Sequence, residues 1–263
     1  MAQTNNLTAL NAAVTKAGLA TTLSDPNASV TVFAPTDAAF GTLATRLGFA
    51  SAAALVDALP PTTLASILSH YVLPTKKSAA DLTTGGASQT TLYRFGGAST
   101  ALSLQTTNGV ASDGVVHVIG KVLVPPGVLN IVQMAQVNPI FTTLVGAVVA
   151  TNLQGTLSGA GPFTVFAPTN DAFAAIQSTV AGLSTAQLTE MLTRHVLPSQ
   201  VPAANIPFVT PITTVEGETS TVHAGAAPTI TDKTTMPGRI VATDVRASSG
   251  VIHVIGKVLI PTL

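Results

Sequence analysis

Residues 31–40 read TVFAPTDAAF, and residues 164–173 read TVFAPTNDAF, so nearly the same box recurs at an offset of 133 residues. Residues 114–125 read GVVHVIGKVLVP, and residues 250–261 read GVIHVIGKVLIP, at an offset of 136 residues. Solenoid repeats recur about every 20–50 residues, so a period this long indicates two copies of a whole domain.

A third box lies between the other two in each copy. It reads SHYVLP around His70 and RHVLP around His195, and all three boxes recur in the same order. In the first copy, the box at residues 114–125 runs into Pro126 and Gly127. The resulting Pro125-Pro126-Gly127 is typical of a turn or linker. We therefore predict one domain over residues 1–126 and a second over residues 127–263.

The first box predicts a strand, a stop and a helix. Thr-Val-Phe is a short β-branched and aromatic run, and Pro35 ends it because proline cannot donate to a ladder. Thr36 is a suitable N-cap, and Asp37 adds negative charge at the positive end of the helix dipole. The second copy offers the same arrangement at Pro168, Thr169 and Asn170.

The remaining pattern places helices before strands within each copy, which is typical of an α+β fold. The last box is rich in β-branched residues and apolar on both faces, so it predicts a buried central strand. Helices are expected over residues 7–19, 52–58, 62–71 and 184–195 and from Asn138-Pro139, and strands over residues 90–95, 101–105 and 115–124.

Composition excludes several classes of function. Charged residues make up only 8%, the formal net charge is zero, and there is no cysteine. A nucleic-acid binder needs a basic patch, and disulfides or thiolate metal sites need cysteine, so none of these is expected. No apolar run reaches about 18 residues, so no membrane-spanning helix is expected.

The three boxes together resemble the fasciclin I domain family, and the resemblance covers essentially the whole chain twice. It implies two tandem domains, each a wedge-shaped β-sandwich of two sheets with a helical layer. It also implies adhesion and matrix association. The resemblance further implies a secreted, periplasmic or cell-surface location. Residues 1–6 read MAQTNN and lack an apolar segment, so we expect the signal peptide to be absent from this sequence.

Two positions depart from the family pattern. The family's middle box often reads Tyr-His, a pair linked to integrin recognition in animal members, whereas Ser69 and Arg194 precede the histidines here. The last box often carries Asp after Val-Ile, where this chain has Gly120 and Gly256. These departures fit a bacterial or algal member better than an animal one.

The residues shared by both copies are candidate binding residues, although a structural role is favoured for each. A histidine at a helix C-terminus is favoured by the dipole, and a lysine four residues beyond a strand histidine projects to the same face. The candidates are His70, Tyr71, His195, His117, His253, Lys121 and Lys257.

Catalytic and metal sites are not expected. No HExxH or G-x-S-x-G motif is present, and no histidine pair has the i, i+4 spacing of a helical metal site. Eleven acidic residues in 263 leave little material for acid–base pairs. We therefore predict no enzyme activity, no cofactor and no metal.

The leading hypothesis is an adhesion module that binds a surface or matrix protein or a polysaccharide through two linked domains. An alternative is carriage of an apolar small molecule, such as a carotenoid or lipid, since some algal fasciclin-like proteins bind carotenoids. Any membrane association is expected to use a part of the protein outside this sequence, and no nucleic acid is expected as a partner.

Overall fold

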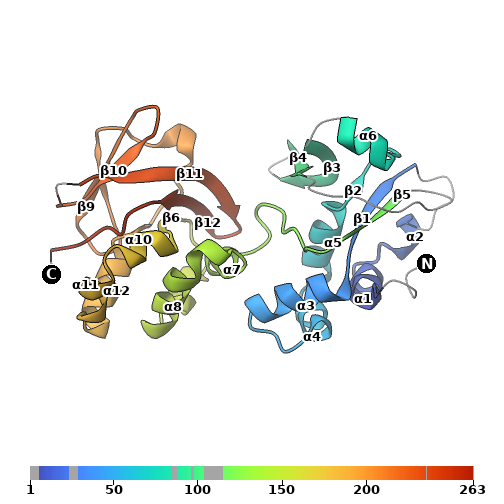
Figure 1. The fold of residues 1–263 in the computed structure, drawn as a ribbon, viewed down its shortest axis with the longest axis horizontal. Coiled ribbons are helices and arrows are strands. Elements are labelled where there is room, and N and C mark those ends of the chain that lie inside the picture. Colours follow the sequence, from blue (N-terminus) through green and yellow to red (C-terminus); the bar gives the residue numbers. More distant parts are fainter. Residues whose placement is uncertain are drawn as a thin grey trace. The chain divides into compact units, whose positions relative to one another are not determined.

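The chain divides into two compact units, Met1–Val128 and Leu129–Leu263, in a computed structural model (Figure 1). Each unit contains one copy of the three boxes. The sequence placed the boundary two residues earlier, at the proline pair. The structure describes residues 6–23, 29–84, 88–95, 98–103, 115–234 and 236–262.

The first unit combines a group of helices with two small sheets. Its helices are α1 (Thr8–Lys16), α2 (Ala20–Leu23), α3 (Asp37–Arg46), α4 (Ala52–Ala58), α5 (Pro61–Ser69) and α6 (Ala79–Thr84). Its strands are β1 (Thr31–Pro35), β2 (Val72–Leu73), β3 (Ser88–Phe95), β4 (Ala98–Ser103) and β5 (Val115–Ile119). The described strands form a sheet in the order β2-β1-β5 and a β3-β4 hairpin.

The second unit has the same plan, and its described strands form one seven-stranded sheet. Its helices are α7 (Ile131–Gln136), η1 (Pro139–Phe141), α8 (Thr142–Ala150), α9 (Gln154–Leu157), α10 (Asn170–Ala174), α11 (Gln177–Ala181), α12 (Thr185–Thr193) and η2 (Ala203–Asn205). Its strands are β6 (Phe163–Pro168), β7 (Val196–Leu197), β8 (Pro211–Thr213), β9 (Thr219–His223), β10 (Thr229–Thr231), β11 (Gly238–Ala247) and β12 (Gly250–Ile255). The strand order is β7-β6-β12-β11-β10-β9-β8.

The first and last boxes of each unit pair as parallel neighbours. In the first unit β1 lies beside β5, with Phe33 opposite His117. In the second unit β6 lies beside β12, with Phe166 opposite His253. The sequence predicted both strands but not this pairing, because periodicity within a strand carries no information on its partner.

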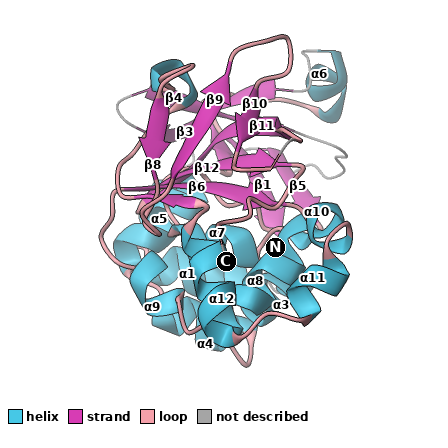
Figure 2. Ribbon diagram, turned by 90° about the vertical axis from the view of Figure 1, so that its left-hand side faces the viewer, coloured by secondary structure: helices cyan, strands magenta, loops and turns pink. Residues whose placement is uncertain are grey.

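The central strands of the second unit are apolar on both faces because each face packs against a different layer. Val165 and Ile252 pack with the helices in one core. Phe166 and Ile255 point the other way into a second core, which the remaining strands complete. Figure 2 shows α8, α10 and α12 of this unit on one side of its strands β9, β10 and β11. This confirms the α+β sandwich with a helical layer.

The two ends of this strand order come together. Val215, just after β8, donates its backbone N–H to the carbonyl of Val196 in β7 at 2.8 Å. β7 and β8 are the two end strands of the hydrogen-bonded order. The bond from Val215 to Val196 connects the residues just after β8 to β7. The sheet therefore encloses the second core rather than lying open over it.

The N-caps predicted from the first box are confirmed. Thr36 Oγ1 accepts from the N–H of Ala39 at 3.2 Å, and Thr169 Oγ1 accepts from the N–H of Ala172 at 3.3 Å. Each strand extends through the proline, so Pro35 and Pro168 are its last residues.

Asp37 lies in the first turn of its own helix, as predicted, and the residue after each cap also bonds a neighbouring helix. Asp37 Oδ1 accepts from the N–H of Ala9 at 2.7 Å, and Asn170 Oδ1 accepts from the N–H of Thr143 at 3.0 Å. These donors lie in the first turns of α1 and α8, which have no side-chain cap of their own. Asp37 and Asn170 therefore cap the neighbouring helix, which only the tertiary structure reveals.

The middle-box helices end earlier than predicted. The capping box of Ser184 and Gln187 is confirmed, but α12 ends at Thr193 and α5 ends at Ser69. The following Val-Leu pairs form β2 and β7, antiparallel to the central strands. Pairing with the sheet, rather than the proline, decides where these helices stop.

The described residues contain no single helix with the length and apolar composition needed to cross a membrane. Helices α4 and α5 reach that composition only when joined, and their axes meet at 114°.

Gly250 is expected to be essential to the second unit. Its φ is +148°, and a Cβ there would lie 1.9 Å from the carbonyl oxygen of Phe163 on the adjacent strand. Gly250→Ala should destabilise the protein by about 3 kcal/mol or more, because the two parallel strands would have to separate. Urea unfolding measures the change.

Gly256→Ala is the matched control, six residues along the same box. A Cβ at Gly256 would meet nothing closer than 3.9 Å, and its backbone is not in the left-handed region. Its effect should stay within about 1 kcal/mol. Equal losses for both variants would contradict this assignment.

Candidate functional site

The last-box histidines are buried beside the first-box phenylalanines. His117 stacks on Phe33 with ring centroids 5.4 Å apart, and His253 lies against Phe166 at 5.5 Å. His117 Nε2 lies 3.3 Å from the carbonyl oxygen of Lys77. His253 Nε2 donates to the carbonyl of Val201 at 2.9 Å, and burial lowers the pKa of His253 below its usual value.

The first-box threonines form hydrogen bonds to the same loops that these histidines contact. Thr31 Oγ1 donates to the carbonyl of Thr75 at 2.9 Å and accepts from the N–H of Lys77 at 2.8 Å. Thr164 makes the equivalent pair with Ser199 at 2.7 Å and Val201 at 2.8 Å. Sequence reasoning missed both threonines, although each opens the repeated TVFAPT box.

The three boxes therefore meet at one loop in each unit. The loop follows the middle box, and it is held by a threonine from the first box and a histidine from the last. Thr31, Thr164, His117 and His253 are all buried. Buried polar groups are retained when they are hydrogen-bonded, so these residues support the fold.

His195 is buried and neutral, which corrects the prediction that a helix dipole favours its charged form. Its Nδ1 donates to the carbonyl of Met191 at 2.7 Å, and its Nε2 accepts from the backbone N–H of Leu259 at 2.8 Å. Burial lowers its pKa to about 4. A protonated ring would lose the acceptor that Leu259 needs.

Tyr71 has this role in the first unit. Leu123 is the counterpart of Leu259 at the offset of 136 residues, and Tyr71 Oη both donates to its carbonyl, at 2.7 Å, and accepts from its N–H. His70 is directed elsewhere, with Nδ1 3.4 Å from Thr91 Oγ1. Burial raises the pKa of Tyr71 and lowers that of His70. The two units thus satisfy one buried backbone group with different side chains.

The two lysines do not project from the final strands, which corrects the prediction for Lys121 and Lys257. β5 ends at Ile119 and β12 at Ile255, so each lysine lies two residues past its strand. Lys121 is exposed, whereas Lys257 Nζ donates to Asp232 Oδ1 at 2.8 Å.

Asp232 secures the end of the second unit. Burial alone would raise the pKa of this carboxyl, but bonds from Lys257, Thr234 and the N–H of Ile260 hold it below its usual value. The carboxylate therefore stays charged and ties the residues after β12 to the β10–β11 connection.

Arg194 is a buried cation that sequence reasoning did not identify. Its Nη1 lies 2.5 Å from Glu218 Oε2 and 3.3 Å from Glu216 Oε2, and its Nη2 donates to the carbonyl of Thr219 at 2.8 Å. The bond from Lys233 makes the largest contribution to lowering the pKa of Glu218, to about 2. The strand register places Leu73 and Leu197 opposite equivalent threonines, so Arg194 stands where the first copy has His70, and this substitution was the signal in the sequence.

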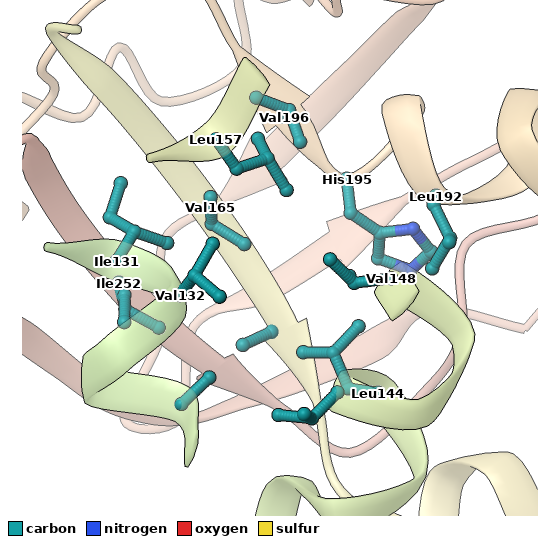
Figure 3. Close-up of a pocket in the computed structure, with 13 residues that line it drawn as sticks. Ile131, Val132, Leu144, Val148, Leu157, Val165, Leu192, His195, Val196 and Ile252 are labelled. Atoms are coloured by element: carbon teal, nitrogen blue, oxygen red, sulfur yellow. The ribbon is translucent and has the colours of Figure 1, made fainter. Parts of the chain in front are cut away.

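The second unit contains an apolar cavity of about 30 Å³ between its helices and its sheet. Figure 3 shows Val132 of α7 and Val148 of α8 facing Val165 of β6, with His195 at one end. The lining is apolar apart from the imidazole, whose nitrogens are bonded to Met191 and Leu259. This cavity therefore brings no pair of acid–base groups together.

Most of the candidate binding residues are thus inside their units. His70, Tyr71, His195, His117 and His253 are buried, and a ligand reaches them only if the fold opens. A direct binding role for them, and for the two lysines, stays a prediction. Within the described part of the chain, no group of three His, Asp or Glu side chains is placed to hold a metal ion.

Comparisons with known proteins give the family and its distribution. A sequence profile described as the Fasciclin domain matches residues 5–125 and again residues 139–261. Protein sll1483 of Synechocystis sp. is 41% identical over 140 residues, which is 51% of this chain and 75% of that protein. Protein sll1735 of the same organism is 35% identical over 134 residues, 50% of this chain and 97% of that protein.

Animal relatives are longer. Transforming growth factor-beta-induced protein ig-h3 of Sus scrofa is 36% identical over 155 residues, 57% of this chain but only 22% of that protein. A solved FAS1 domain pair from the insect cell adhesion molecule fasciclin I covers 98% of both chains at 14% identity, with a TM-score of 0.49.

Tyr71→Phe should destabilise the first unit by about 1–3 kcal/mol, because it leaves the partly buried N–H and carbonyl of Leu123 without their partner. Denaturant unfolding provides the measurement. Tyr93→Phe is the control, since it removes a phenol of the same unit that donates to the carbonyl of Pro126 at 2.9 Å and does not bond Leu123. A loss for Tyr71→Phe no larger than the control's would show that Leu123 does not depend on the phenol.

The buried His195 should make the second unit sensitive to acid. The folded pKa of His195, about 4, lies below the usual value of 6.5, so its contribution to stability is present above pH 6.5 and is lost as pH falls toward 4. The shift corresponds to about 3 kcal/mol. NMR titration of the His195 ring should give a pKa near 4, and a value near 6.5 would contradict a buried neutral imidazole.

Proposed function

Because the chain belongs to the fasciclin domain family, with one domain in each half, we propose that it is a non-enzymatic adhesion protein of a cell surface or extracellular matrix. Fasciclin domains occur in adhesion proteins. The relatives that cover most of their own length in the match are cyanobacterial. The partner is a surface or matrix protein or polysaccharide.

The observation that carries the proposal is the use of the repeated polar residues inside the fold. His253, His195 and Thr164 bond backbone groups, and none presents a reactive atom to an open site. General acid–base catalysis needs groups positioned at a substrate with pKa values near the working pH. Because these repeated polar side chains form hydrogen bonds inside the fold, we place binding on other residues at the surface.

Residues 207–211 of the second domain contribute an exposed apolar pair. Phe208 is 41% exposed and Val209 is 70% exposed, between two prolines in residues 207–211. Val209 has a φ of +62°, which is strained for a β-branched residue, and its N–H donates to Val222 at 2.8 Å. Exposed aromatic anchors held in a fixed backbone are typical of binding surfaces.

A tandem arrangement supports adhesion in a further way. Two binding domains on one chain raise the effective concentration of the second contact once the first has formed. Weak contacts by each domain therefore combine into stable attachment to a surface that displays many copies of the partner.

A second candidate function is carriage of an apolar small molecule, and the apolar cavity of the second unit is the observation that favours it. At about 30 Å³ the cavity is well below the ~150 Å³ of an engineered site that binds benzene. A carotenoid or lipid would therefore require the helices to move away from the sheet. Visible absorbance or extractable lipid in natively purified protein would support this function.

Replacing the exposed pair tests the adhesion proposal. Immobilised full-length protein should retain material from the envelope or matrix of the producing cell, and Phe208→Ser with Val209→Ser should weaken retention by about tenfold. The control is Met236→Ser, because Met236 is 73% exposed on a different connection. Absence of any retained envelope or matrix component by the unaltered protein would overturn adhesion as its function.

A further inference from the structure

Strand β11 has an open side beyond the end of β10. β10 pairs with β11 at two positions, Thr229 with Arg239 and Ile230 with Gly238. The N–H of Ile240 then donates to the carbonyl of Pro228 at 2.8 Å. β11 continues to Ala247, with β12 along its other side (Figure 1). No described strand pairs with the β10 side of β11 after this point.

A groove occupies the space where the two strands separate. It has a volume of about 380 Å³ and lies between Ala226–Pro228 and Arg239–Thr243. That volume falls within the roughly 300–1,000 Å³ typical of ligand sites. Val241 is 54% exposed there, so both backbone and apolar side-chain surface are accessible.

The other edges of this sheet are protected. β8 begins with Pro211, which cannot donate to a ladder, and is only three residues long. The bond from Val215 to Val196 joins β8 to β7. The groove beside β11 is thus the place, among the described strands of this unit, where an added strand meets a short edge that neither a proline nor another strand covers.

Arg239 gives the groove a charge. It is exposed, and within the described part of the chain it forms no ion pair, whereas Arg246 on the same strand lies 3.8 Å from Asp244. The groove's other lining residues are uncharged. A carboxylate on the occupant is therefore the complementary group, since guanidinium binds carboxylate with two parallel hydrogen bonds.

We infer that this groove binds an extended peptide of a partner protein, which adds as a strand beside Val241–Thr243 and places a carboxylate against Arg239. Main-chain hydrogen bonds to an open edge supply affinity, and the arginine supplies selectivity for an acidic residue. This inference rests on the proposed adhesion function and names a protein segment, rather than a polysaccharide, as what the second domain recognises.

An edge this short predicts weak binding at a single site, which two domains on one chain offset through avidity. The register shifts in β11 around Ala242 limit the pairing to a few residues. We expect a Kd of about 0.1–1 mM for a short peptide.

The test is a titration of the ¹⁵N-labelled full chain with acetyl-Thr-Val-Thr-Val-Asp-amide. Backbone amide signals of Val241, Ala242 and Thr243 should shift and saturate. The same peptide with Asn in place of Asp should bind about tenfold more weakly, because it lacks the charge that Arg239 pairs with. A backbone N-methylated peptide should not bind, since it cannot extend the ladder.

Two variants complete the design. Arg239→Gln should weaken binding of the acidic peptide about tenfold and remove its preference over the Asn peptide. Arg246→Gln is the matched control on the same strand and should leave the affinity unchanged. Signals elsewhere in each spectrum verify that the variants fold.

Saturating shifts outside the groove, no shifts up to about 1 mM peptide, or equal affinity of Arg239→Gln and unaltered protein would each overturn the inference. The proposed function is judged separately, by retention of envelope or matrix material. Loss of peptide binding with retention intact would remove this site and leave adhesion standing. Saturable peptide binding without retention would do the reverse.

Discussion

The fold of each domain depends on one loop that all three repeated boxes hold in place. The loop leaves the middle box and is bonded by Thr31 and His117 in the first domain, and by Thr164 and His253 in the second. These side chains come from the two parallel central strands, so the bonds form only when those strands lie side by side. Each bond joins a buried side chain to a backbone group of the loop, and such a bond contributes about 1 kcal/mol.

The same constraint explains why the boxes were so readily found in the sequence. Residues that meet at one buried point cannot change independently, and the duplication has kept them while the connections between them changed length. The equivalent backbone groups of Leu123 and Leu259 show that some change is tolerated. The Tyr71 phenol bonds the first, and the His195 imidazole bonds the second. What the scaffold requires is a partner of suitable reach, not a particular side chain.

The proposed function depends on the residues that the fold does not use for its internal hydrogen bonds. Polar residues repeated between the domains are used within the fold, so differences between the domains, rather than their shared boxes, are where recognition is placed. The second domain carries the segment that exposes Phe208 and Val209, the ion pairs of Arg194, and the open side of β11. Adhesion through protein contacts uses these features without requiring a catalytic centre.

The sequence by itself determined the duplication, the α+β class, the buried final strand of the second domain, and the caps at Thr36 and Thr169, because these depend on local pattern and neighbouring residues. Only the tertiary structure decided that the first and last boxes pair in parallel, that Asp37 caps a helix other than its own, and that His195 is neutral. Those outcomes depend on contacts between residues far apart in the chain, and strand or helix periodicity does not encode which distant group a buried side chain meets.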